Sequence, residues 1–173
     1  MKEMFNTRFI SVSGLILLAA LSRLMPHPDN VTPVTAIALF GGAYFSKKIF
    51  AFIVPLAAML ASDLLLGFHV AMPGVYLSFA IIVLIGFSLQ NKTNVRNILL
   101  STLAGAVIFF IISNFALWAF GTWYPHSWTG FIECYAMALP FFRNSIVGDL
   151  AYSGVIFGCY ALVMRYSPSL AKG

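Results

Sequence analysis

Residues 95–121 read VRNILLSTLAGAVIFFIISNFALWAFG, and this stretch decides the class of fold. Arg96 is its single charged residue, and most of the others are apolar. A helix needs about 20 predominantly apolar residues to cross the hydrocarbon core of a bilayer, which is roughly 30 Å thick. The stretch is therefore predicted to form a transmembrane helix.

Five further apolar stretches are predicted to cross the membrane. They comprise residues 9–25, 33–45, 49–68, 73–89 and 145–166. Residues 129–142 are less apolar and are predicted to form a short interfacial or re-entrant helix between helices five and six. The expected fold is an all-α integral membrane protein with six transmembrane helices. Stretch 33–45 is short, and the charge pattern described below holds only if it crosses.

The composition of the chain supports the same class. Of its 173 residues, 61% are apolar and 9% are charged, and the mean hydropathy is +0.93. A soluble domain has about a quarter of its residues charged. Residues 1–173 fit one transmembrane domain and leave no room for a second, ATP-hydrolysing module. The net charge of +5 comes from residues that stand singly or in pairs beside apolar stretches, which indicates membrane topology rather than nucleic-acid binding.

The charged residues sort to two sets of helix ends. Eight basic residues and one acid, Glu3, fall at one set: Lys2, Arg8, Lys47, Lys48, Lys92, Arg96, Arg165 and Lys172. Basic residues are retained on the cytoplasmic side of a membrane. Both termini are therefore predicted to be cytoplasmic, in a multi-pass protein of the bacterial cytoplasmic (inner) membrane.

The other, external half carries the polar residues that are candidates for a binding site. Charges within spans are costly and rarely face lipid, because they pair with one another or line a cavity. Their convergence on one face predicts a substrate-binding pocket that is open to the outside, formed by Arg23, Asn30, Asp63, Asn114, Arg143, Asn144 and Asp149. The alternative is that Arg23 and Arg143 neutralise Asp63 and Asp149 in purely structural salt bridges.

Histidines and aromatic residues also fall in the external loops. His27, His69 and His126 lie one in each loop, and His27 and His69 are counted with the pocket. Ligation of a metal, or of a corrinoid cobalt, stays an alternative because imidazole suits such metals, but no metal site and no cofactor is predicted. Trp123 and Trp128 belong to loop 122–128. This loop either lies in the lipid headgroup layer or closes as a lid that stacks on a flat ring of the bound ligand.

Several short motifs resemble an uncharacterised bacterial membrane family described only as candidate transport proteins. The resemblance covers about residues 20–160 and rests on RLMPHPDN (23–30), TPVTA (32–36), ALFGGAYF (38–45), PLAA (55–58), SDLLLG (62–67), LPFFRN (139–144) and GD (148–149).

More loosely, six spans, two cytoplasmic termini and the SDLLLG run resemble the substrate-binding S components of energy-coupling-factor transporters. This resemblance implies a vitamin or metal ion bound in an outward pocket, and partners that comprise a transmembrane T component and ATPase subunits. Such proteins often carry Ala-x-x-x-Ala on their first helix for the T component. Here that spacing occurs at Ala57 and Ala61 of the third stretch instead, which leaves open whether the chain works alone.

The sequence favours a membrane-embedded substrate-binding component for uptake of a small vitamin-like molecule, and not an enzyme. It contains no Gly-x-x-x-x-Gly-Lys-[Ser/Thr] loop, so it cannot energise uptake by itself. Two alternatives stay open. One is a membrane enzyme that uses Asp63 or Asp149 beside His27 or His126 as acid or base. The other is a non-transporting structural subunit.

Overall fold

The structure, a computed structural model, describes residues 7–26 and 28–166. These residues form six helices and no strand, which confirms the prediction of an all-α fold. The helices are α1 (Thr7–Ser22), α2 (Val34–Tyr44), α3 (Lys48–Leu66), α4 (Met72–Ser88), α5 (Val95–Phe120) and α6 (Trp128–Tyr166).

Three of the helices, α3, α5 and α6, are long and apolar enough to cross a membrane. At 1.5 Å per residue, the 19 residues of α3 extend about 28 Å, close to the thickness of a bilayer core. Helices α1, α2 and α4 are apolar but shorter. The 11 residues of α2 extend only about 16 Å.

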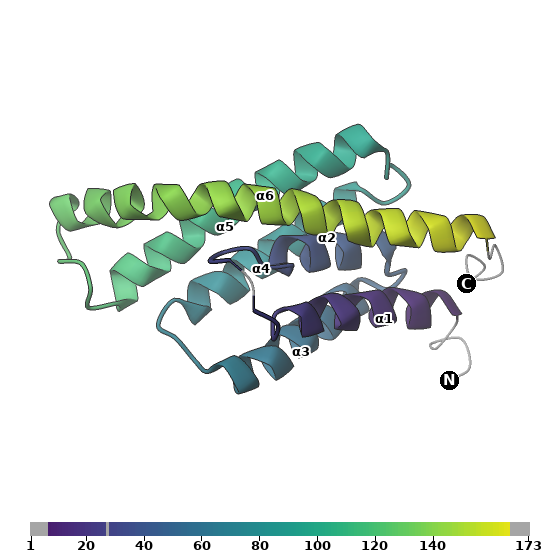
Figure 1. Cartoon of the computed structure of the whole chain (residues 1–173), viewed down its shortest axis with the longest axis horizontal. Coiled ribbons are helices and arrows are strands. Elements are labelled where there is room, and N and C mark those ends of the chain that lie inside the picture. The colour runs from purple at the N-terminus through teal and green to yellow at the C-terminus, as the bar shows by residue number, and fades with distance from the viewer. Residues whose placement is uncertain (1–6, 27, 167–173) are drawn as a thin grey trace.

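The six helices lie side by side and alternate in direction, so α1 begins and α6 ends at the same end of the bundle (Figure 1). That end, called the basic end below, carries Arg8, Lys47, Lys48, Lys92, Arg96 and Arg165. The opposite end, called the cavity end, carries Arg23, Arg143 and the four described acidic residues. Lys2, Glu3, Lys172 and His27 lie outside the described residues.

Helix α2 forms the centre of the bundle. Ten of its 11 residues are buried, and it contacts all five other helices. Helices α2 and α4 cross closely where Gly42 of α2 lies against Gly86 of α4. A Cβ atom added to Gly86 would lie 2.6 Å from the carbonyl oxygen of Leu39, so the crossing requires glycine there. Arg8 Nε and Gln90 Nε2 donate to the carbonyl oxygens of Tyr44 and Gly42, which satisfies acceptors at the end of α2. Since its neighbours enclose it, α2 needs no lipid-facing surface of its own.

Helix α6 corrects one sequence prediction. Residues 129–142 and 145–166 do not form two helices, because Trp128–Tyr166 is one continuous helix of 39 residues with Pro140 inside it. Proline is tolerated within membrane helices when neighbouring segments satisfy the freed backbone groups. Here the first half of α6 packs along the last half of α5, and this α5–α6 hairpin extends beyond the other helices at the cavity end (Figure 1).

The outward faces of the helices are apolar. Large side chains such as Leu65 on α3, Leu84 on α4 and Leu162 on α6 are more than half exposed. Exposed apolar surface of this extent marks a membrane or partner interface, and it agrees with the composition of the chain.

Candidate ligand-binding cavity

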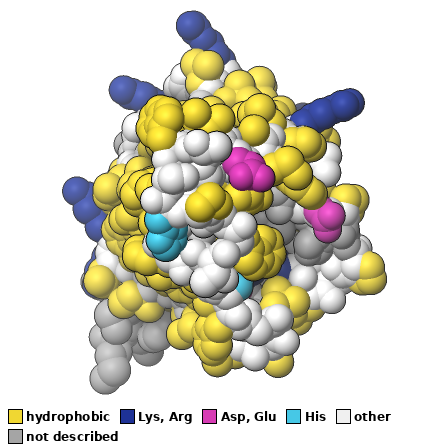
Figure 2. Space-filling view, turned by 90° about the vertical axis from the view of Figure 1, so that its left-hand side faces the viewer, with side chains coloured by type: hydrophobic (Ala, Val, Ile, Leu, Met, Phe, Trp, Pro, Cys, Tyr) yellow, Lys and Arg dark blue, Asp and Glu magenta, His cyan; other side chains and the backbone are white. Residues whose placement is uncertain are grey.

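A cavity of about 490 Å³ lies at the cavity end of the bundle. Its walls come from the loop between α1 and α2, the beginning of α4, the last half of α5 and the first half of α6. Figure 2 looks onto this end, whose surface is hollowed, while most of the basic side chains in view project from the periphery. The volume falls within the range of pockets that enclose small organic molecules.

The α5–α6 hairpin builds one wall of this cavity. Tyr135 Oη donates to the carbonyl oxygen of Ile111 at 2.6 Å, and the rings of Phe110 and Phe142 lie 4.5 Å apart between centroids. Asn114 Nδ2 donates to the carbonyl oxygen of Phe110 within α5. The hairpin thus holds an amide and several aromatic rings at the cavity.

The opposite wall is the loop that leads into α2. Asn30 has φ of 61°, a left-handed conformation that Asn tolerates better than most residues. Asn144 Nδ2 on α6 donates to the carbonyl oxygen of Asp29, which ties this loop to the hairpin. The chain then enters the bundle and places Thr35, in the first turn of α2, at the cavity.

Asp149 lines the inner part of the cavity. The residue is only 5% exposed, and Thr35 Oγ1 donates to its Oδ2 at 2.9 Å. Among the described residues no cation forms an ion pair with Asp149. Arg143, its expected partner, is exposed on α6, six residues earlier in the chain. The cavity is therefore lined by a buried carboxyl group that has no basic partner among the described residues.

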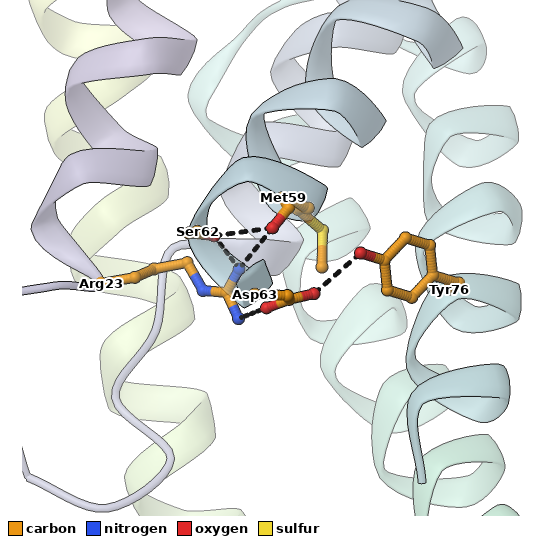
Figure 3. A network of polar contacts seen from close by, with 5 residues as sticks. All are labelled: Arg23, Met59, Ser62, Asp63 and Tyr76. Atoms are coloured by element: carbon orange, nitrogen blue, oxygen red, sulfur yellow. Dashed lines mark hydrogen bonds and ion pairs between the residues drawn. The ribbon is translucent and has the colours of Figure 1, made fainter. Parts of the chain in front are cut away.

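Asp63 has the opposite surroundings (Figure 3). Its Oδ1 accepts from Arg23 Nη2 at 2.7 Å in a buried ion pair, and its Oδ2 accepts from the hydroxyl of Tyr76 at 2.8 Å. Arg23 Nη1 also donates to Ser62 Oγ and, at 3.5 Å, to the carbonyl oxygen of Met59. This polar network joins the end of α1 to α3 and α4, and it satisfies both carboxylate oxygens.

One atom of the network has no partner. Arg23 Nε is buried and makes no hydrogen bond to the residues that the structure describes. Arg23 also lines the cavity. A buried donor without an acceptor costs about 1–3 kcal/mol, and an acceptor on a bound molecule would remove that cost.

Six of the eleven residues predicted for the pocket line the cavity together: Arg23, Asn30, His69, Asn114, Trp123 and Asp149. Four others do not line it. Asp63 pairs with Arg23, Arg143 is exposed, Asn144 bonds to the loop, and Trp128 stacks on Phe131 with ring centroids 5.4 Å apart. His27, the eleventh, lies outside the described residues.

Sequence reasoning missed several residues of this region. Thr35 and Tyr76 donate to the two buried carboxylates, and Ser62 accepts from Arg23 Nη1. Phe109, Phe110 and Phe142 supply rings to the cavity. Hydroxyl and phenyl groups are common in membrane helices, so only their spatial position distinguishes them.

The histidines lie apart from one another in the described part of the chain. His69 lines the cavity, whereas His126 Nε2 lies 3.2 Å from the carbonyl oxygen of Gly121. Neither is hydrogen-bonded to Asp63 or Asp149. No three His, Cys, Asp or Glu side chains of residues 7–26 and 28–166 come together as metal ligands.

Comparison with known proteins places the chain in a family. Residues 3–170 match a family of unknown function, DUF6580. The protein belongs to this family. Searches of curated proteins and of solved structures gave no match. The cavity is therefore the feature of this chain that bears on its function.

Proposed function

We propose that this protein is a membrane-embedded substrate-binding component for uptake of a small, vitamin-like molecule, which binds in the cavity between α4, α5, α6 and the α1–α2 loop. The observation that carries the proposal is the cavity of about 490 Å³, which brings together an amide, aromatic rings and a buried carboxyl group without a basic partner among the described residues. A pocket with mainly apolar walls and a few polar groups is typical of small-molecule sites.

We further propose that the chain passes six times between the two faces of the bacterial cytoplasmic membrane, with both termini cytoplasmic. The 11 residues of α2 cover about half of the bilayer core and lie inside the bundle. The concentration of Lys and Arg at the basic end supports this orientation, because positive residues stay inside. The cavity then opens to the outside. Helices α1 and α4, with 16 and 17 residues, are only slightly shorter than a bilayer core.

Cysteine labelling tests this orientation. Cys134→Ala and Cys159→Ala first remove both native thiols. In spheroplasts, a membrane-impermeant maleimide is expected to label a Thr122→Cys variant and to leave a Lys92→Cys variant unlabelled until the membrane is opened. Labelling of Lys92→Cys in closed spheroplasts would contradict the proposed orientation.

An uptake component of this kind needs a source of energy. The absence of a phosphate-binding loop from the sequence supports a division of labour in which a T component and ATPase subunits drive transport. Transport without such partners stays the alternative. Expression of the chain alone in a strain without energy-coupling-factor proteins, followed by uptake of the ligand found below, separates the two.

Tryptophan fluorescence tests ligand binding, because the chain contains only three Trp residues. A variant with Trp118→Phe and Trp128→Phe keeps Trp123, which lines the cavity. A matched variant with Trp118→Phe and Trp123→Tyr keeps Trp128, which stacks outside the cavity on Phe131. We expect a panel of water-soluble vitamins and nucleobases to change the emission of the first variant and not that of the second.

The outcome of this panel decides the proposal. A compound that changes Trp123 emission and raises the melting temperature of the wild-type protein supports it, since a ligand that binds the folded state stabilises that state. If no compound changes either quantity, and the purified protein carries no small molecule, the proposed function is wrong.

A further inference from the structure

The charged groups around the cavity do not balance. Arg23, Asp29 and Asp149 are the charged side chains that line it. The Arg23 guanidinium is already neutralised by Asp63 at 2.7 Å. Arg143, the other basic residue of this end, is exposed and does not line the cavity. The described side chains therefore give the cavity two acidic groups and one basic group, and the basic group is already paired.

Asp149 is the buried one of the two acidic residues that line the cavity. This residue is 5% exposed and accepts one hydrogen bond, from Thr35, among the described residues. A buried carboxylate is costly unless a cation or several donors stabilise it. A positively charged group of a ligand would supply the missing partner.

Aromatic rings line the same cavity. Phe109, Phe110, Phe142, Trp123 and Tyr124 surround it on the α5–α6 side. The negative faces of such rings attract cations and stack on flat, delocalised rings. By contrast, Ca²⁺ and Mg²⁺ take about six or more oxygen ligands, and Zn²⁺ takes about four N, O or S ligands. No group of three His, Cys, Asp or Glu side chains forms among the described residues.

We infer that the molecule bound in this cavity is an organic cation with a flat ring, whose positive nitrogen lies beside Asp149 while the rings of the α5–α6 hairpin cover its faces. The inference rests on the proposed function and names the substrate class of the same site. Asp149 is then a specificity-determining residue, and Thr35 positions its carboxylate.

Three probes of nearly equal size test the charge of the preferred ligand: N1-methylnicotinamide, a cation; nicotinamide, which is neutral; and nicotinate, an anion. Binding is followed by Trp123 emission in the Trp118→Phe, Trp128→Phe variant and by calorimetry with the wild-type protein. We expect the cation to bind about tenfold or more tightly than nicotinamide, and nicotinate to bind weakest.

Asp149→Asn connects this preference to one side chain. The variant keeps an oxygen that can accept from Thr35 but loses the charge. Its affinity for N1-methylnicotinamide is expected to fall about thirtyfold, while its affinity for nicotinamide stays the same. Glu133→Gln is the matched control, because Glu133 is exposed on α6 and does not line the cavity, and it is expected to bind all three probes as the wild type does.

Several results would overturn the inference. If the wild type binds nicotinamide or nicotinate more tightly than N1-methylnicotinamide, the inference is wrong and the proposed function still stands. The same holds if Asp149→Asn keeps the wild-type preference for N1-methylnicotinamide. If Asp149→Asn does not fold, the order of the three probes on the wild type decides. Absence of binding by all three probes also overturns the inference, whereas the proposed function depends on the separate vitamin panel.

Discussion

Asp63 and Asp149 are both buried carboxylates on long helices at the same end of the bundle, yet their surroundings differ. Asp63 receives the Arg23 guanidinium on one oxygen and the Tyr76 hydroxyl on the other. Asp149 receives only the Thr35 hydroxyl among the described residues, and it faces a cavity. The cost of burying the first charge is offset within the fold. Asp149 has no comparable partner among the described residues, and this contrast is what the proposed binding role of Asp149 rests on.

The largest effect on stability is expected at the paired acid. Asp63→Asn keeps the size of the side chain but leaves the Arg23 charge, 11% exposed, without its counter-ion. Breaking a buried pair in this way costs about 3 kcal/mol or more. Reversible unfolding in mixed micelles measures the loss.

A double-mutant cycle provides the control for that loss. The combination of Arg23→Met with Asp63→Asn is expected to be less destabilising than the sum of the two single variants, because the residues are in direct contact. Additive effects would show that the ion pair is not what holds α1 and α3 together.

A smaller loss is expected at the second partner of Asp63. Tyr76→Phe removes one hydrogen bond of 2.8 Å to the carboxylate, and the unfolding free energy should fall by about 1 kcal/mol. Tyr166→Phe serves as the matched variant, because Tyr166 is 78% exposed at the end of α6. Equal effects of the two substitutions would show that Tyr76 is not part of the network.

Packing behind Thr35 gives a third test. A Cβ atom at Gly105 of α5 would lie 2.7 Å from Thr35 Cγ2, whereas one at Gly154 of α6 would meet nothing within 4 Å. Gly105→Ala is expected to destabilise the fold by about 1 kcal/mol and to weaken binding of the cationic probe, because it displaces the hydroxyl that positions Asp149. Gly154→Ala should change neither quantity. Wild-type binding by Gly105→Ala would remove Thr35 from the site.

The smallest effect on stability is expected at the unpaired acid. Asp149→Asn removes a buried acid that has no counter-ion among the described residues and keeps an acceptor for Thr35, so the unfolding free energy should stay within about 1 kcal/mol of the wild-type value. A loss as large as that of Asp63→Asn, measured under the same conditions, would remove the distinction between the two acids.

The sequence predicted an all-α fold and the approximate positions of its helices, because apolar stretches are read directly from composition, but it divided α6 into two helices. It also placed Arg23, Asn114 and Asp149 at one end, since charge sorting fixes the direction of each helix. It did not predict the continuity of α6 across Pro140, which depends on packing against α5.

The sequence could not distinguish the two acids either. A carboxylate in an apolar stretch indicates a partner or a cavity but does not say which. The pairing of Arg23 with Asp63 depends on how α1 packs against α3. Arg143 and Asp149 lie six residues apart on α6, a spacing that puts them on different sides of the helix, with Arg143 exposed. Thr35 and Tyr76 carried no signal that differs from that of other hydroxyl side chains.

Native mass spectrometry of the protein released from its membrane mimetic tests the central claim most directly. We predict that the wild-type protein and Tyr76→Phe each retain one small, positively charged organic molecule, and that Asp149→Asn retains none. Retention of the same molecule by Asp149→Asn, or no bound molecule in any of the three proteins, would contradict the account.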